Sequence, residues 1–295
     1  MKHELSILIP IYNSDCREQV TKLSRQAEAI DGLAYEMIVA DDGSPETAVG
    51  DWLSAVSQLP NVRCIRREQN AGRAAIRNFL AQQAKYEWLL FMDGDMSIPT
   101  EDFLRKWVEA DIEQVGYGGY IVGTGNVSNL RYLYEKQCEP MHRAEERRKR
   151  PFMHFHTCNF MIAKELMLQH PFDERFHHYG YEDVLFGKRL RQAGITIAHP
   201  DNPAGFFDYE DNARFVSKTE EGLRTLHTFR HDLRGYSHLL TITDGIHIGV
   251  IKSLIRLWHR LFGEMERRSL CGKAPNLKVF KIYKLGYYLS LTNND

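Results

Sequence analysis

The stretch that decides the fold is Trp88-Leu-Leu-Phe-Met-Asp-Gly-Asp95, five mostly apolar residues followed by two acids. A short apolar run that stops at a turn indicates a buried strand. Leu5–Ile11 and Glu36–Ala40 are similar runs, and the second also stops at acids, Asp41 and Asp42. Because ligands of α/β sheets bind beyond the carboxyl ends of strands, these acids predict a site at that edge.

Helical spacing between these runs completes the pattern. It predicts helices over Arg17–Ile30, Thr47–Val56 and Ala74–Ala84, with a further strand at Val62–Ile65. Short strands that alternate with helices indicate an α/β domain with a mostly parallel central sheet. We place the domain boundary near Asp244, which gives a catalytic domain over 1–243 and a helical, basic extension over 244–295.

Charge is unevenly distributed along the 295 residues. The net charge of -1 gives no reason to expect a nucleic-acid partner. Residues 247–295 hold nine Lys/Arg and three Asp/Glu, a charge of +6, which leaves -7 for the remainder. A basic tail on an acidic body predicts an anionic surface, such as a membrane, as a partner.

The five cysteines form no CxxC pair and are odd in number, which indicates neither a disulfide framework nor a zinc site. The N-terminus has no signal-peptide layout, and no apolar run approaches the ~18 residues that would span a bilayer. These features predict a cytoplasmic protein whose membrane contact is at the inner face.

Asp93 and Asp95 alternate at a strand end, where both carboxylates can meet one hard cation such as Mn²⁺ or Mg²⁺. Acids in turns are more often simply solvated, so the pair alone is weak. The same holds for Asp41-Asp42-Gly43-Ser44, which also fits an Asx turn. Glu182 and Asp183 open a helix, where acids can serve as caps or as a catalytic base.

Taken together and in order, these stretches resemble family 2 glycosyltransferases, which have the GT-A fold. The resemblance covers about Leu5 to Glu221. The matching stretches are Ser6-Ile-Leu-Ile-Pro-Ile-Tyr-Asn13, Val39-Ala-Asp-Asp-Gly-Ser44, Asn70-Ala-Gly-Arg-Ala-Ala-Ile-Arg-Asn78, Phe91-Met-Asp-Gly-Asp95 and Gly180-Tyr-Glu-Asp183.

The resemblance implies a nucleotide-binding role for residues at the first strands. Pro10 and Tyr12 match the loop that lines the nucleotide, and Asp42, with Asp41 beside it, matches the acid that reads the base. Arg77 matches a basic residue that approaches the nucleotide or its phosphates.

The resemblance also implies the catalytic groups. Asp95 is the expected main metal ligand, and Asp93 is expected to contact the ribose or the metal. Asp183 is the expected general base, and Glu182 is expected to help hold the acceptor.

One feature departs from the family pattern. Many members carry a late His metal ligand, expected here within Pro203–Glu210, and this chain has none there. Asp208 or His199 could replace it, or water completes the coordination shell; we favour an ordinary strand-end or surface role for His199. The roles of four further histidines stay unassigned: His154, His156, His177 and His178.

The resemblance implies an inverting transfer of a hexose or N-acetylhexosamine, as in polysaccharide biosynthesis, from a nucleotide-sugar, with UDP favoured. The expected acceptor is a hydroxyl of a glycan or a lipid-linked molecule.

A nucleotidyltransferase is the alternative enzyme, but Ile9–Asp15 lacks the Gly-rich basic loop that such enzymes usually have. The other alternative is a protein that binds a sugar-nucleotide but does not catalyse a reaction. No GxGxxG followed by a helix supports a NAD-binding domain.

Apolar residues repeat at helical spacing from Ile248 to Met265, with Lys252, Arg256 and Arg260 among them. Two interpretations fit this pattern. The apolar stripe can pack on the catalytic domain, as most such stripes face a core. It can also lie on an anionic membrane as a basic amphipathic helix.

Overall fold

The computed structural model describes residues 1–153 and 155–291. Contacts between residues divide the chain into two compact units. The first comprises Met1–Gly123, Glu139–His177 and Glu182–Phe207, and the second comprises Thr124–Cys138, His178–Tyr181 and the chain from Asp208 onward. The boundary predicted near Asp244 falls within the second unit, on helix α11 (His238–Gly245), and stays a prediction.

A seven-stranded sheet forms the centre of the first unit, in the order β3-β2-β1-β4-β7-β5-β8. Strand β7 runs antiparallel to β4 and β5, and the other neighbouring pairs are parallel. The predicted mostly parallel α/β sheet is therefore confirmed. The strands are β1 (Glu4–Ile11), β2 (Ala34–Asp41), β3 (Val62–Arg66), β4 (Trp88–Met92), β5 (Val115–Tyr117), β7 (Asn159–Ala163) and β8 (Ile197–Ala198).

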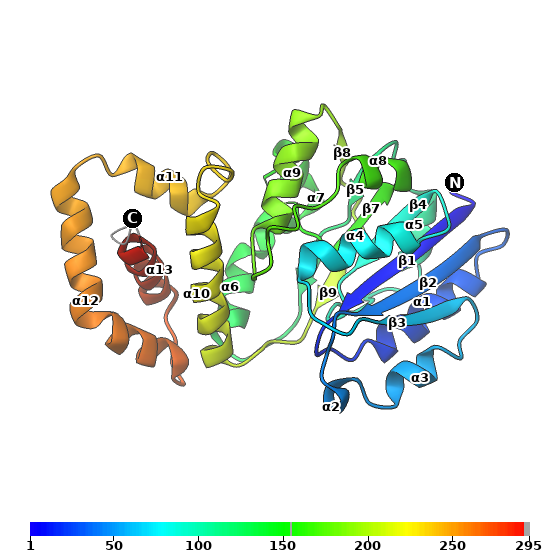
Figure 1. Cartoon of the computed structure of the whole chain (residues 1–295), viewed down its shortest axis with the longest axis horizontal. Coiled ribbons are helices and arrows are strands. Elements are labelled where there is room, and N and C mark those ends of the chain that lie inside the picture. Colours follow the sequence, from blue (N-terminus) through cyan, green and yellow to red (C-terminus); the bar gives the residue numbers. More distant parts are fainter. Residues whose placement is uncertain (154, 292–295) are drawn as a thin grey trace. The chain divides into compact units, whose positions relative to one another are not determined.

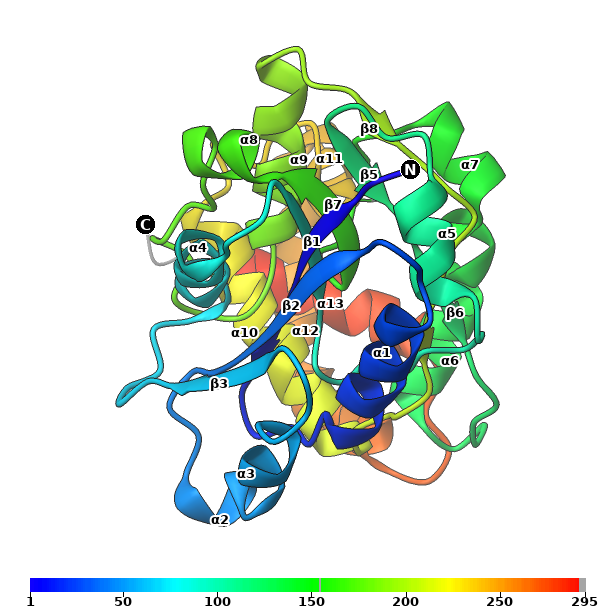
Figure 2. The same cartoon turned by 90° about the vertical axis from the view of Figure 1, so that its right-hand side faces the viewer.

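Helices cover both faces of this sheet. Helices α4 (Arg73–Gln83) and α8 (Lys164–Gln169) lie on one face, and α1 (Arg17–Glu28) and α5 (Phe103–Glu109) lie on the other (Figure 2). Burial on both faces explains why β1 and β4 are continuous apolar runs rather than alternating ones.

Smaller elements complete the first unit. They are α2 (Glu46–Val49), α3 (Trp52–Val56), a 3₁₀ turn (Glu139–His142), α7 (Ala144–Lys149), α9 (Glu182–Gln192) and a second, two-stranded sheet of β6 (Tyr120–Val122) and β9 (Ala204–Phe206). The single helix predicted over Thr47–Val56 is wrong, because Gly50 adopts a φ of +49° and separates α2 from α3. The left-handed conformation that glycine tolerates interrupts the helical hydrogen bonds.

The strand register gathers the predicted acids at one edge. Ile11 pairs with Asp41, and Met92 pairs with Asn159. Because β7 is antiparallel to β4, its amino end lies beside the carboxyl end of β4, at the edge where β1 and β2 also end. The residues that follow these strands, and the residues that precede β7, therefore meet at the same edge of the sheet.

His199, one candidate for the missing metal ligand, has a structural role instead. Its Nδ1 accepts from Arg147 Nη1 at 3.0 Å, so its Nε2 donates to the Pro151 carbonyl at 3.2 Å. Burial, and then the neighbouring Arg147 charge, lower the pKa of His199 to about 4. The buried Arg147 also donates to the carbonyls of Gly118 and Pro200. His199 thus stays neutral, with both ring nitrogens engaged.

The second unit is helical. Its elements are α6 (Leu130–Cys138), α10 (Asn212–Thr228), α11, α12 (Gly249–Cys271) and α13 (Leu277–Leu291). Helix α13 packs against both α10 and α12 (Figure 1). The core of this unit joins Leu130, Phe215, Val216, Leu270, Phe280 and Tyr283. The predicted helical C-terminal extension is therefore confirmed.

Candidate active site

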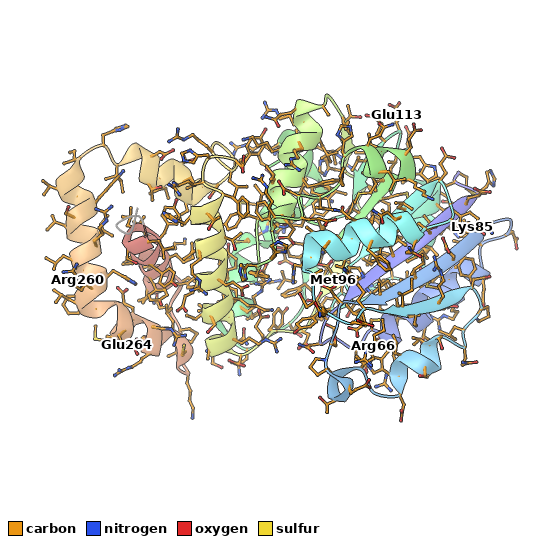
Figure 3. The ribbon with its side chains drawn as sticks, viewed as in Figure 1. Arg66, Lys85, Met96, Glu113, Arg260 and Glu264 are labelled. Atoms are coloured by element: carbon orange, nitrogen blue, oxygen red, sulfur yellow. The ribbon has the colours of Figure 1, made fainter. Side chains whose placement is uncertain are left out.

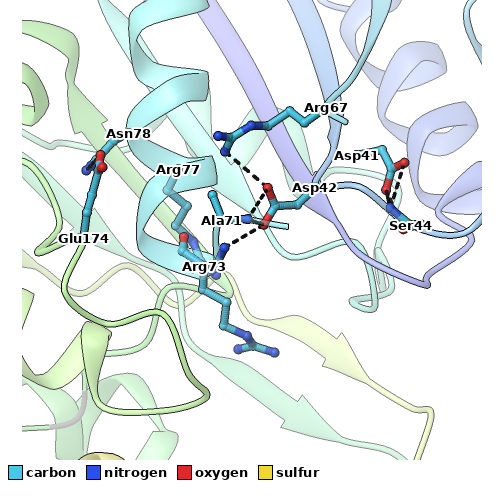
Figure 4. Close-up of polar contacts among 10 residues, drawn as sticks. Asp41, Asp42, Ser44, Arg67, Ala71, Arg73, Arg77, Asn78 and Glu174 are labelled. Atoms are coloured by element: carbon cyan, nitrogen blue, oxygen red, sulfur yellow. Dashed lines mark hydrogen bonds and ion pairs between the residues drawn. The ribbon is translucent and has the colours of Figure 1, made fainter. Parts of the chain in front are cut away.

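Asp42 fixes the loop that leads into α4. Its carboxylate accepts hydrogen bonds from the amides of Gly72 at 2.9 Å and Ala71 at 3.2 Å, and Arg67 Nη1 lies 3.2 Å away (Figure 4). Burial raises the pKa of Asp42, and these amide and guanidinium contacts oppose the rise. Gly43 has a φ of +76°, and a Cβ there would lie 2.7 Å from the Gln69 carbonyl carbon. The loop after β2 and the loop that leads into α4 are therefore in backbone contact, and the Asp42 carboxylate holds them together.

Asp41 lies deeper, with no exposed surface. Its carboxylate accepts from Ser44 Oγ at 2.5 Å and lies 3.4 Å from Arg66 Nε. Both predicted base-reading acids are thus held by protein groups within the first unit. They shape the loops after β2 and β3, and their contact with a nucleotide stays a prediction.

Arg77 occupies the centre of the site and is only 1% exposed. Its Nη2 donates to Asp93 Oδ1 at 2.5 Å, its Nη1 lies 3.7 Å from Glu182 Oε1, and Nη1 also donates to the Arg73 carbonyl at 3.1 Å. The guanidinium therefore links the acid after β4 to the acid that opens α9. Its direct contact with a nucleotide stays a prediction.

Arg73 is the accessible guanidinium on α4. Its side chain is 44% exposed, and its Nη1 lies 4.0 Å from Glu182 Oε1. The spacing of four residues places Arg73 and Arg77 on one face of α4. Arg73 is accordingly the better placed of the two to meet an anion from solvent.

The Asp-Gly-Asp turn after β4 is partly exposed. Asp93 is half-buried, and Asp95 is exposed. The Asp93 amide donates to the Cys158 carbonyl at 3.2 Å, which ties this turn to the chain before β7. Burial raises the pKa of the Cys158 thiol well above its usual range, and Asp93, Asp95 and Asp183 add to the rise. A neutral thiol thus lies among the three acids.

Asp183 and Glu182 differ in their surroundings although they are adjacent. Burial, and then the Asp183 charge, raise the pKa of Glu182 against the opposing effect of Arg73 and Arg77. Burial would also raise the pKa of Asp183, but its contacts with His156, the Val184 amide and Arg77 outweigh that effect and lower it. Asp183 is thus the carboxylate held in its basic, ionised form.

His156 is the principal partner of Asp183. Its Nδ1 lies 3.0 Å from Asp183 Oδ2, while the Val184 amide donates to Oδ1 at 2.7 Å. The His142 ring lies 5.2 Å from the His156 ring, and His142 Nε2 lies 2.8 Å from Tyr120 Oη. Both oxygens of Asp183 are therefore held by hydrogen bonds, and an aromatic cluster that includes His142 packs against the His156 ring.

The structure brings together most residues named from the sequence. The loops after β2 and β3 contain or contact Asp41, Asp42 and Arg77. The same sheet edge holds two pairs of acids, Asp93 with Asp95 and Glu182 with Asp183. Pro10 is in β1, and Tyr12 directly follows it with half of its surface exposed.

The sequence left His156 without an assigned role and did not indicate Cys158 or Arg67 for this site. Two of these residues precede β7, and only its antiparallel pairing with β4 brings them to the acids. His177 is exposed in the first unit and His178 in the second, while His154 lies outside the described residues.

The acids fit a hard divalent cation bound together with a phosphate ligand. Mg²⁺ and Mn²⁺ prefer oxygen ligands, and Mg²⁺ usually binds through one or two carboxylates, substrate phosphates and several waters. The exposed Asp95 and the half-buried Asp93 provide such a partial set. Within residues 1–153 and 155–291, no group of three or more His, Cys, Asp or Glu is arranged to hold a metal. Asp208, the other candidate for the missing ligand, is exposed in the second unit.

Sequence comparison decides the family. Residues 6–170 match the profile of glycosyl transferase family 2. The chain belongs to this family. The chondroitin synthase of Escherichia coli is 27% identical over 254 residues, which are 71% of this chain and 36% of that protein. The dolichol-phosphate mannosyltransferase of Pyrococcus furiosus is 34% identical over 131 residues, 43% of this chain and 36% of that protein. The chain spans little more than a third of either relative.

Solved structures confirm the predicted GT-A fold. The mannosyltransferase PcManGT of Pyrobaculum calidifontis, in complex with GDP-Man and Mn²⁺, has a TM-score of 0.55 at 13% identity over 98% of this chain and 86% of that one. Residues 1–349 of S. aureus TarS in complex with UDP have a TM-score of 0.52 at 16% identity, over 100% of this chain and 91% of that one. These likenesses concern the fold.

Replacing Arg77 with Met should lower the free energy of unfolding by about 3–5 kcal/mol, because it leaves the buried Glu182 and the half-buried Asp93 without their shared cation. Urea unfolding measures the change. Arg73→Met is the matched control, and its exposed ion pair should be worth ~1 kcal/mol or less. Equal effects of the two variants would contradict the central role of Arg77.

Replacing His156 with Phe should move the acidic limb of the kcat/KM profile to higher pH. The His156 contact lowers the pKa of Asp183, so its loss lets burial dominate and the pKa rises. Asp183, the predicted base, can accept a proton only when ionised, so activity should then disappear at a higher pH than in the wild type. An unchanged limb, measured with a stably folded variant, would show that His156 does not act through Asp183.

Proposed function

We propose that this protein is an inverting glycosyltransferase that moves a sugar from a nucleotide-sugar to an acceptor hydroxyl, with Asp183 as the general base. The observation that carries this proposal is the orientation of Asp183 by His156 and the Val184 amide at the sheet edge that also holds Asp93 and Asp95. A base and a pair of cation-binding acids at one edge are what transfer from a diphosphate donor needs.

The donor in this proposal is a UDP-sugar. Support comes from TarS, a protein of the same fold that is described with UDP and with UDP-GlcNAc. The chondroitin synthases among the relatives favour a hexose or N-acetylhexosamine. The expected cation is Mn²⁺ or Mg²⁺, and the Mn²⁺ of PcManGT supports this choice. Bound at Asp95, with Asp93 beside it, the cation would offset negative charge on the departing diphosphate.

The reaction balances around the acceptor oxygen. Asp183 takes the proton of the hydroxyl as its oxygen forms a bond to the anomeric carbon. The bond from that carbon to the diphosphate oxygen breaks, and the nucleoside diphosphate leaves with the electron pair. One displacement of this kind inverts the anomeric centre. In this proposal Arg73, exposed beside Glu182, attracts the anionic donor, and Glu182 helps to hold the acceptor.

The acceptor in this proposal is a glycan or a lipid-linked molecule in the cytoplasm. The polymer-forming relatives support a glycan acceptor. The five cysteines, all in the described part of the chain, are free thiols, which suits a reducing compartment.

Asp183→Asn should reduce the transfer rate by roughly 10²–10⁴-fold and leave donor binding nearly unchanged, because the amide cannot accept the proton. Single-turnover transfer and donor titration measure the two effects separately. Asp31→Asn is the matched control, since this exposed acid precedes β2 and lies away from the carboxyl edge. Transfer by Asp183→Asn at the wild-type rate would exclude this residue as the base.

Nucleotide release identifies the donor and tests the metal site. We expect one sugar from a panel of UDP-, GDP- and dTDP-sugars to release nucleotide with Mn²⁺ or Mg²⁺, but not with EDTA, and Asp95→Asn to lose this activity. An acceptor extract is included so that absence of acceptor does not mask transfer. Donor-induced thermal stabilisation without turnover would favour a non-catalytic binder. Pyrophosphate release from a sugar phosphate and a nucleoside triphosphate would favour a nucleotidyltransferase.

A further inference from the structure

Helix α12 presents an apolar face to solvent. Seven large apolar side chains along it are between 42% and 67% exposed. Their spacing of three or four residues places them on one side of the helix. This surface, called the α12 face below, consists of Val250, Ile251, Leu254, Leu257, Trp258, Leu261 and Met265.

The opposite side of α12 makes the contacts within its unit, and many of them are polar. Arg267 Nε donates to Glu220 on α10 at 2.8 Å, and Arg256 Nε donates to the Leu289 carbonyl on α13 at 3.0 Å. The His259 ring lies 5.4 Å from the Tyr283 ring. The buried residues of α12 are Gly263, Glu266 and Leu270. The helix therefore packs through its more polar side, and the α12 face is left for another surface.

Cations border the α12 face. Arg260, which Figure 3 labels, and Arg268 are exposed on the same helix. Lys273 is exposed two residues after the helix ends. Of the two acids on α12, Glu266 is buried and accepts from Trp258 Nε1 at 2.8 Å, and Glu264 lies 3.1 Å from Arg268. Exposed apolar side chains with surrounding positive charge suit an anionic lipid surface.

The dimensions of α12 fit a helix that lies along a bilayer. Across the described residues, none of the helices combines the length and apolar character needed to span a membrane. An amphipathic helix instead buries its apolar side at the headgroup boundary, where tryptophan is favoured. Trp258 lies on the α12 face with about half of its surface exposed.

We propose that the α12 face is a docking surface for an anionic phospholipid membrane, an inference that goes beyond the transferase reaction and does not depend on it. Charge favours lipid over a second copy of the chain. A symmetric dimer through this face would bring the cations of two copies together, and repulsion between them opposes association. An anionic bilayer offers opposite charge and an apolar layer at once.

Vesicle flotation with the full-length protein tests the proposal. We expect binding to vesicles of phosphatidylcholine with phosphatidylglycerol, little binding to phosphatidylcholine alone, and weaker binding as salt rises. The double variant Leu254→Gln, Leu261→Gln should bind about tenfold more weakly or worse, since two apolar anchors are lost. Leu168→Gln, an exposed leucine on α8 in the first unit, is the matched control.

A second pair of variants tests the charges. Arg260→Gln with Lys273→Gln should weaken binding roughly 25-fold, because each cation near an anionic surface contributes about a fivefold factor. Arg105→Gln with Lys106→Gln on α5 removes the same charge from the first unit and should have little effect. Circular dichroism and thermal unfolding establish that each variant is folded.

Trp258 fluorescence gives a readout in the unmodified chain. Anionic vesicles should shift the emission to shorter wavelength, and Trp258→Phe should remove the shift. Failure of the wild type to float with anionic vesicles, with no change in emission, overturns the proposal. So does a dimer that forms through this face, is lost in Leu254→Gln, Leu261→Gln, and excludes vesicles. Either result leaves the transferase proposal standing, because nucleotide release is measured without lipid.

Discussion

The buried guanidinium of Arg77 is the interaction on which the arrangement of the site depends. It contacts Asp93 at the end of β4 and Glu182 at the start of α9, two elements far apart in the sequence. Without this cation, the buried Glu182 and the half-buried Asp93 would both lose a partner, at a high cost in free energy. The same residue follows Arg73 by one helical turn, so α4 fixes both guanidinium groups relative to the acids.

This arrangement also separates the roles of two adjacent acids. Glu182 is buried beside the Asp183 charge, and its pKa rises. Asp183 receives a hydrogen bond on each oxygen, and its pKa falls despite burial. Neighbouring carboxylates whose surroundings push their pKa values apart can do different work. Asp183, the base predicted from family resemblance, is thus also the acid whose contacts keep it ionised.

The sequence predicted the elements of the site better than the contacts between them. Apolar runs that stop at acids are local features, so β2, β4 and the acids after them could be recognised without a structure. His156 could not, because its place beside Asp183 depends on the antiparallel entry of β7 next to β4. The burial of Arg77 likewise follows from the packing of α4, whereas the family resemblance suggested contact with a nucleotide or its phosphates. His199 is a further example. Its structural role depends on Arg147, which lies 52 residues away, so no local sequence pattern could reveal this contact.

The apolar repeat in helix α12 could not predict what its apolar side would contact. The repeat from Ile248 to Met265 predicts that one side of the helix is apolar, but it does not say whether that side faces a core or solvent. That depends on what α10 and α13 offer, and these helices present Glu220, Tyr283 and the Leu289 carbonyl to the polar side of α12. The hydrophobic effect still favours removing the other side from water. A lipid surface satisfies that tendency without a further protein segment, and the cations around the face then act in the same direction as the apolar side chains.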